Sequence, residues 1–244
     1  MSRLDPRLLL QGYATGIFPM ADSRGADELF WVEPKNRAII PIDGFHVSRS
    51  LRRTIRSGKF TVTHDRDFAG VIAACADREE TWINAELERA MLALHGSGHA
   101  HSIEVWRDEK LVGGLYGVKL GRAFFGESMF SRTTDASKVA LAWLVARLKV
   151  GNFTLLDCQF MTEHLASLGA ITVSRESYVA LLATALGGAA AAGAGSVVLP
   201  GAAALILDAP PDFVALDRLL ELAGAAGAGG PAGYVIAQLL GHTS

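Results

Sequence analysis

The segment SIEVWRDEKLVGGLYGVKLGRAFFGESMF, residues 102–130, contains the clearest β-strand pattern in this 244-residue sequence. Three runs with many apolar, β-branched and aromatic residues, 102–107, 111–118 and 122–130, are separated by short turns around Asp108 and Gly121. Runs of this kind joined by tight turns are typical of antiparallel strands. We therefore expect an antiparallel three-stranded meander in this part of the chain.

The residues that follow the meander predict a crossover unit. Asp135 is a candidate N-cap for a helix that runs to residue 149 and carries a broad apolar face. Residues 153–160, FTLLDCQF, are typical of a buried strand. A strand, a helix and a strand in this order predict two parallel strands with a right-handed connection.

Shorter patterns flank this unit on both sides. Apolar runs at 13–20, 29–32 and 38–42 predict short strands, and capped amphipathic patterns predict helices at 49–56, 67–76 and 85–95. Helices are also expected at 162–169, 174–186 and 214–223. The prediction is an α+β fold with a small N-terminal α/β domain (1–75), a catalytic domain (76–186) and an Ala/Gly-rich C-terminal extension (187–244).

Composition narrows the classes of protein. Half of the residues are hydrophobic, a fifth are charged and the net charge is −2, which excludes overall disorder and requires any nucleic-acid site to be a local patch. Cys75 and Cys158 are the two cysteines, and their separation argues against a disulfide framework. The uncharged stretch 177–207 is rich in Ala and Gly and interrupted by Pro200, so no membrane span is expected. The N-terminus lacks a signal peptide pattern, so we expect a cytoplasmic protein.

One candidate patch lies on the helix expected at 49–56. Its basic residues follow i, i+3, i+4 and i+7 spacing and share one face: Arg49, Arg52, Arg53 and Arg56. Guanidinium groups match phosphate oxygens, although a solvated helix face explains the pattern equally well. Trp31 and Trp82 could stack on unpaired bases or cover the edge of a core.

The candidate catalytic residues lie on two of the expected strands. Because alternate residues of a strand face the same side, Asp157 and Gln159 are expected to project together, with Cys158 on the opposite face. Glu127 lies in the neighbouring strand, so the two carboxylates could meet at a common cleft near the strand ends. A structural role for each acid remains open at this point. Motifs for zinc or for nucleotide phosphates are absent, so no metal and no cofactor are expected.

Several segments together resemble the leucyl/phenylalanyl-tRNA–protein transferase family, in the family's order. They are GIFPM (16–20), FHVSRS (45–50), TWI (81–83), GHAHSIEVW (98–106), GGLYG (113–117), GESMFSR (126–132), ASK (136–138), LDCQ (156–159) and HLASLGA (164–170). The resemblance implies that the catalytic domain is GNAT-like. It also implies a monomeric enzyme that moves Leu or Phe, and less readily Met, from aminoacyl-tRNA to the N-terminal Arg or Lys of proteins, marking them for N-end-rule degradation.

The resemblance also implies roles for individual residues. Asp157 would accept or orient the proton of the attacking amine, Gln159 would position the donor carbonyl, and Glu127 would bind the cationic N-terminus. The aminoacyl pocket would consist of Leu115, Phe124, Met129, Leu141 and Leu144. Trp31 and Trp82 would flank the 3′ adenosine, while the arginine helix would hold the acceptor stem.

Two other functions are compatible with parts of the sequence. An acyl-CoA-dependent N-acetyltransferase would need a glycine-rich loop before the helix that starts near Asp135, and residues 130–134, FSRTT, contain no glycine. A non-catalytic tRNA-binding module would need the arginine face but not the two carboxylates.

Overall fold

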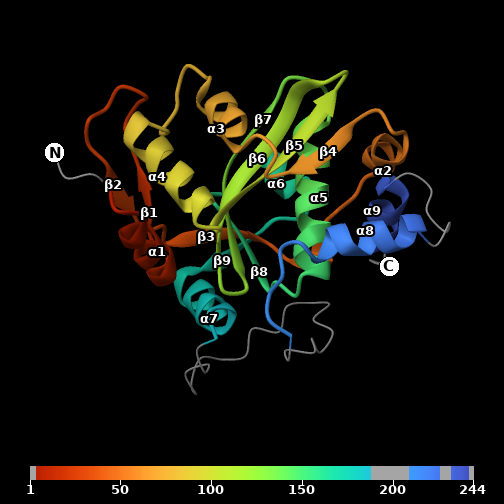
Figure 1. The fold of residues 1–244 in the computed structure, drawn as a ribbon. Coiled ribbons are helices and arrows are strands. Elements are labelled where there is room, and N and C mark those ends of the chain that lie inside the picture. Colours follow the sequence, from red (N-terminus) through yellow and green to blue (C-terminus); the bar gives the residue numbers. More distant parts are fainter. Residues whose placement is uncertain (1–3, 188–208, 226–231, 242–244) are drawn as a thin grey trace.

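A seven-stranded mixed sheet forms the centre of the computed structural model, which describes residues 4–187, 209–225 and 232–241 (Figure 1). The strand order is β4-β5-β6-β7-β8-β3-β9. The strands are β3 (Asn36–Ile40), β4 (Thr61–His64), β5 (Ala100–Arg107), β6 (Lys110–Leu120), β7 (Ala123–Ser131), β8 (Leu155–Gln159) and β9 (Ile171–Ser174). The expected mixed α+β class and the β5-β6-β7 meander are confirmed.

The crossover unit is confirmed, but the capping of its helix is not. Strands β7 and β8 are parallel, whereas the other paired strands of the sheet are antiparallel, and α5 (Ala136–Val150) connects the two. Asp135 precedes α5 with φ 68° and its side chain makes no capping hydrogen bond. That carboxylate instead lies 3.4 Å from both Lys138 Nζ and Thr54 Oγ1, so the expectation that it caps the helix was wrong.

Helices cover both faces of the sheet (Figure 1). On one face, α5 packs on β5, β6 and β7 and is itself contacted by α2 (Arg49–Arg56), α8 (Ala215–Ala225) and α9 (Ala232–Leu239). On the other lie α1 (Pro6–Thr15), α3 (Phe68–Ala76), α4 (Ala85–Gly96) and α7 (Arg175–Ala185). A short helix, α6 (Glu163–Ala166), follows β8, and a 3-10 turn, η1 (Ile42–Gly44), follows β3. Each face therefore has its own hydrophobic core.

The first helix was not predicted, and the start of the strand expected at 13–20 falls inside it. Asp5 accepts a hydrogen bond from the Arg7 amide and Pro6 is the first helical residue, which together start α1. Tyr13 belongs to this helix and not to a strand at 13–20. The chain then forms a two-stranded sheet, β1 (Phe18–Met20) with β2 (Phe30–Val32). β3 and β4, which also precede residue 75, are strands of the main sheet.

The described part of the C-terminal extension docks on α5. Phe213 is buried and stacks on Phe124 at 5.6 Å between ring centroids. Arg147, 3% exposed, binds both carboxylate oxygens of Asp217 at 2.6 and 2.7 Å. The extension therefore completes the core on this face of the sheet.

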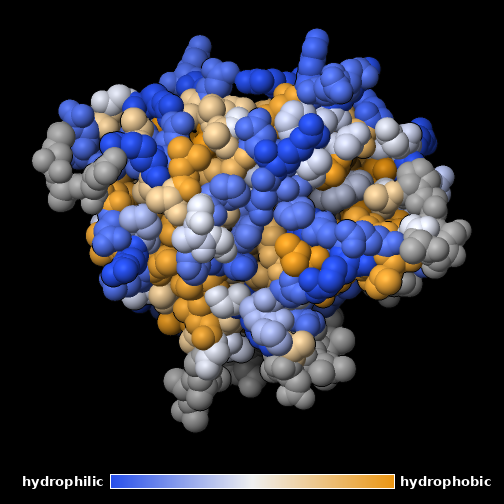
Figure 2. Space-filling model, in the orientation of Figure 1, coloured by the Kyte–Doolittle hydropathy of each residue, from blue (hydrophilic) through white to orange (hydrophobic). Residues whose placement is uncertain are grey.

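Hydrophilic residues gather along the upper rim of the face drawn in Figure 2, over the α3–α4 connection and the β5–β6 turn. The turn expected at Asp108 lies there, with φ values of 50° at Asp108 and 62° at Glu109.

Among the described helices, none combines the length and the hydropathy needed to cross a bilayer.

Candidate active site

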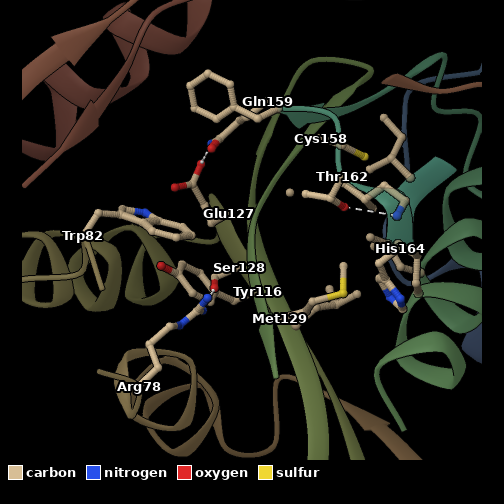
Figure 3. A pocket seen from close by; sticks show the side chains of 17 residues that line it. Arg78, Trp82, Tyr116, Glu127, Ser128, Met129, Cys158, Gln159, Thr162 and His164 are labelled. Atoms are coloured by element: carbon tan, nitrogen blue, oxygen red, sulfur yellow. Dashed lines mark hydrogen bonds between the residues drawn. The ribbon is translucent and has the colours of Figure 1, made fainter. Parts of the chain in front are cut away.

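A cavity of about 300 Å³ opens where β7 and β8 stop pairing. The last paired residues are Phe125 and Asp157, and the cavity is lined by residues that follow on both strands. Figure 3 shows side chains of β7, of β8 and of the α6 region turned toward this space. The site therefore lies at the C-terminal end of the parallel strand pair, as ligand sites in such sheets do.

One part of the cavity wall is apolar. Leu115, Met129, Leu141 and Leu144 line it, so the structure brings together four of the five residues expected to form an aminoacyl pocket. Phe124 does not line it: this side chain is 0% exposed and its ring faces Phe213 of the C-terminal extension. The structure therefore places Phe124 outside the cavity, where a residue of the extension covers its ring.

Glu127 is the buried acid of the cavity. Its Oε1 accepts hydrogen bonds of 2.9 Å from the Tyr13 hydroxyl and from Gln159 Nε2 (Figure 3), and its side chain is 5% exposed. Its Oε2 has no hydrogen-bond partner within the described ranges. Burial raises the pKa of Glu127 to about 7, and the negative charge of Asp157 contributes to this rise against the opposing hydrogen bond from Tyr13.

Asp157 lies outside the cavity, although it is close to Glu127. Its carboxylate is fully buried and accepts hydrogen bonds from Arg37 Nη2 at 2.6 Å, the Tyr178 hydroxyl at 2.9 Å and the Gln159 amide at 2.8 Å. Arg37 is itself 1% exposed, and its guanidinium lies 4.6 Å from the ring centroids of Phe18 and Tyr178. Both carboxylate oxygens are therefore satisfied.

The strict alternation expected along this strand fails at its end. Gln159 has φ 62°, which turns its side chain into the cavity although Asp157, two residues earlier, stays outside it. Cys158 lies on the face opposite Asp157, as expected, and this face lines the cavity. Burial raises the pKa of the Cys158 thiol, so the group contributes a neutral wall.

Polar and aromatic groups form the opposite part of the cavity wall. Arg78 donates a 2.6 Å hydrogen bond to the Ser128 hydroxyl, and its guanidinium lies 5.1 Å from the Trp82 ring centroid. Tyr116 also lines this part, and its buried hydroxyl has no partner in the part of the chain that the structure covers. Trp31 does not line the cavity; it packs over Gly12 and is 37% exposed. The structure thus does not bring the two tryptophans together at this site.

The arginine helix is confirmed, and it lies apart from the cavity. Ser48 accepts a hydrogen bond from the Leu51 amide, while Leu51 and Ile55 are buried. The four arginines share the other face and line a separate hollow. Within the described residues, no group of three or more His, Cys, Asp or Glu side chains could hold a metal ion.

Comparison with known proteins identifies the family to which the sequence belongs. Residues 39–183 match the model of the leucyl/phenylalanyl-tRNA protein transferase, and residues 2–35 match that of its N-terminal domain. The chain belongs to this family. A leucyl/phenylalanyl-tRNA–protein transferase of Rhizorhabdus wittichii is 60% identical over the whole of both chains, and one of Novosphingobium aromaticivorans is 52% identical over the whole of both. A solved structure of FemX resembles 68% of this chain and 66% of its own, with TM-score 0.46 and 11% identity.

The chain is accordingly an aminoacyltransferase whose donor is an aminoacyl-tRNA and whose acceptor is a protein. Several site residues were missed from the sequence: Tyr13, Arg37, Arg78, Tyr116, His164 and Tyr178. Arg37 carried a partial signal, since it directly precedes the apolar run Ala38 to Ile40, and an arginine buried with such a strand needs a counter-charge. Tyr13 and Tyr178 carried none, because their hydroxyls reach the site only through the packing of α1 and α7.

Proposed function

We propose that this enzyme transfers leucine or phenylalanine, and less readily methionine, from tRNA to the N-terminal Arg or Lys of proteins. The product would enter N-end-rule degradation, and the enzyme would act as a cytoplasmic monomer. The observation that supports this proposal is a cavity with an apolar wall on one side and the Glu127 carboxylate on the other. We call this carboxylate half-paired, because its Oε1 accepts hydrogen bonds whereas its Oε2 has no partner among the described residues. Its volume, about 300 Å³, is at the lower end for a small-molecule site and suits one amino-acid side chain with part of a nucleoside.

The apolar wall would receive the side chain of the donor amino acid. Leu115, Met129 and Leu144 offer no charge or hydrogen-bonding group, so a polar side chain would lose its hydration without compensation. His164 lines the same cavity, and burial together with the positive charge of Lys138 lowers its pKa, which keeps the imidazole neutral at pH 7. The side chains of Leu, Phe and Met are uncharged and apolar, so they can enter this wall without losing hydrogen bonds to water.

Glu127 would bind and deprotonate the acceptor amine. An N-terminal ammonium has a pKa of about 8, so a carboxylate with a pKa near 7 is well matched to receive its proton. The free amine attacks the ester carbonyl carbon, the new C–N bond forms, and the bond to the 3′ oxygen of the tRNA breaks. As the amide forms, the nitrogen loses a second proton, which passes to that oxygen. The first proton leaves Glu127 for water, and this step regenerates the carboxylate.

Asp157 and Gln159 would hold Glu127 in position for this step. Asp157 does not line the cavity, so it would not accept the amine proton directly. It accepts the hydrogen bond of the Gln159 amide and thereby fixes a residue whose side chain reaches Glu127 at 2.9 Å. Asp157 is in this proposal a positioning residue, while Gln159 holds Glu127 and orients the donor carbonyl.

The tRNA would approach from the polar side of the cavity. Trp82, with Arg78 stacked against it, offers a flat ring for the 3′ adenosine, while the arginines of α2 would hold the acceptor stem. Trp31 would contact the RNA away from the cavity, on the exposed edge of β2.

The test is a transfer assay with labelled leucyl-tRNA and two peptides that differ only in their first residue, Arg or Gly. Label is expected in the peptide with N-terminal Arg and not in the other. Label in neither peptide contradicts the proposal, and equal label in both contradicts the acceptor specificity. Competition with phenylalanyl-, methionyl- and seryl-tRNA then measures the donor preference, with seryl-tRNA expected not to compete as a donor.

A further inference from the structure

Helix α9, near the C-terminal end of the described chain, packs closely against the arginine helix α2. A Cβ atom on Gly233 would lie 2.0 Å from the Ile55 carbonyl oxygen, so this contact requires glycine. Ile236 and Ala237, on the same side of α9, are buried in the core that includes α5. The position of α9 on α2 is therefore fixed by backbone contact and apolar packing.

Tyr234 of α9 turns away from this packing and toward the arginines. Its side chain is 49% exposed, and the Arg56 guanidinium lies 5.5 Å from its ring centroid.

The ring and the arginines line one open hollow of about 490 Å³. It is lined by Arg49, Arg52, Arg53, Arg56, Ser57 and Tyr234, without an acidic side chain. Among the described residues these four arginines form no ion pair, and the nearby carboxylate of Asp135 already lies beside Lys138. Four unneutralised guanidiniums around a concave surface favour a ligand with several negative charges in a row.

We propose that α9 completes a groove for the RNA backbone of the donor, in which the arginines bind successive phosphates and Tyr234 packs against a ribose or an unpaired base. This inference rests on the proposed donor, which supplies a phosphodiester chain. Tyr234 lies beyond residues 39–183, which match the family model, so the groove extends the site past that part of the chain. The cation–π contact with Arg56 also holds that guanidinium toward the groove.

The experiment measures binding of an uncharged leucine tRNA transcript to the full chain by fluorescence anisotropy, at several salt concentrations between about 50 and 200 mM. Tyr234→Ala is expected to weaken binding about tenfold with an unchanged salt slope, because stacking is not an ionic contact. Arg53→Ala is expected to weaken binding and to reduce the slope of log K against log salt by about 0.7–0.9 for each lost phosphate contact. Tyr234→Phe keeps the ring and is expected to bind like the wild type.

Matched controls separate the possible outcomes. Gln238→Ala alters an exposed residue of the same helix outside the hollow and is expected to have no effect. Gly233→Leu displaces α9 and is expected to lose as much affinity as Tyr234→Ala; tighter binding would show that α9 covers the groove and would overturn the proposal. Binding by Tyr234→Ala within twofold of the wild type would also overturn it. Transfer from leucyl-tRNA by the same wild-type preparation tests the proposed function separately.

Discussion

Glu127 and Asp157 are two buried carboxylates at the end of the same parallel strand pair, and Gln159 contacts both. Asp157 has an arginine, a tyrosine and a backbone amide around it, and it faces no cavity. Glu127 has two neutral donors on one oxygen, a cavity beside it and a pKa raised to about 7. The difference indicates that the fully paired carboxylate holds the site together, whereas the half-paired one is available to a substrate.

The largest expected effect comes from breaking the buried ion pair between Arg37 and Asp157. Arg37→Met leaves Asp157 buried without its counter-charge, which is expected to lower the free energy of unfolding by about 3–5 kcal/mol. Urea unfolding followed by circular dichroism measures the loss. The matched control is Arg175→Ala, whose partner Glu33 is about half exposed; it is expected to change stability by less than about 1 kcal/mol. An equal loss of unfolding free energy in the two variants would mean that the buried ion pair contributes no more to stability than the exposed one.

The half-paired carboxylate is tested by Glu127→Gln. The amide keeps the size of the side chain but accepts no proton, so kcat/KM for transfer is expected to fall about 100-fold while the fold is retained. In the wild type, kcat/KM is expected to rise as the pH increases through about 7, where Glu127 loses its proton. The pH profile between about 5.5 and 8.5 measures this. An unchanged profile in Glu127→Gln would exclude this carboxyl as the proton acceptor.

Glu127→Gln is expected to lower activity but to raise stability. The pKa of Glu127 is raised in the folded chain, so the folded state holds this proton more tightly than the unfolded state does. That contribution to stability is present below the unfolded pKa of about 4.5 and is lost as the pH rises through about 7. Glu127→Gln is therefore expected to gain stability relative to the wild type at pH 8, by on the order of 3 kcal/mol, and little at pH 4. Thermal unfolding at the two pH values measures the gain.

The third substitution tests the residue between the two halves of the site. Cys158 follows Asp157 directly but lines the cavity, so Cys158→Leu is expected to narrow the space for the donor side chain. The ratio of kcat/KM for phenylalanyl- over leucyl-tRNA is expected to fall about tenfold, since a pocket distinguishes side chains by about 1–3 kcal/mol per methylene. Cys75→Ala, at a buried cysteine outside the cavity, is the control and is expected to leave this ratio unchanged.

The sequence predicted the strands and most helices that carry the site, because their signals are local. The meander, the Ser48 cap of α2 and the parallel pairing of β7 with β8 all followed from spacing and turn residues. The partners of the carboxylates did not follow. The distance from Arg37 to Asp157 is 120 residues along the chain and that from Tyr13 to Glu127 is 114, so these contacts depend on the packing of β3 and α1. Strand alternation also misplaced the Gln159 side chain relative to Asp157, because the positive φ of Gln159 is not visible in a pattern.

The smallest expected effect is that of Phe124→Leu on the choice of donor. This substitution compares a residue buried outside the cavity with Leu144, which lines it. Phe124 lies between the sheet and Phe213 of the C-terminal extension, and it does not line the cavity. The substitution is therefore expected to change the phenylalanyl-to-leucyl ratio of kcat/KM by less than about twofold, because the donor side chain never meets this ring. The control is Leu144→Ala, which removes a cavity wall and is expected to shift the same ratio further. A larger shift from Phe124→Leu than from Leu144→Ala would mean that the extension moves aside when the donor binds, and that Phe124 then belongs to the pocket.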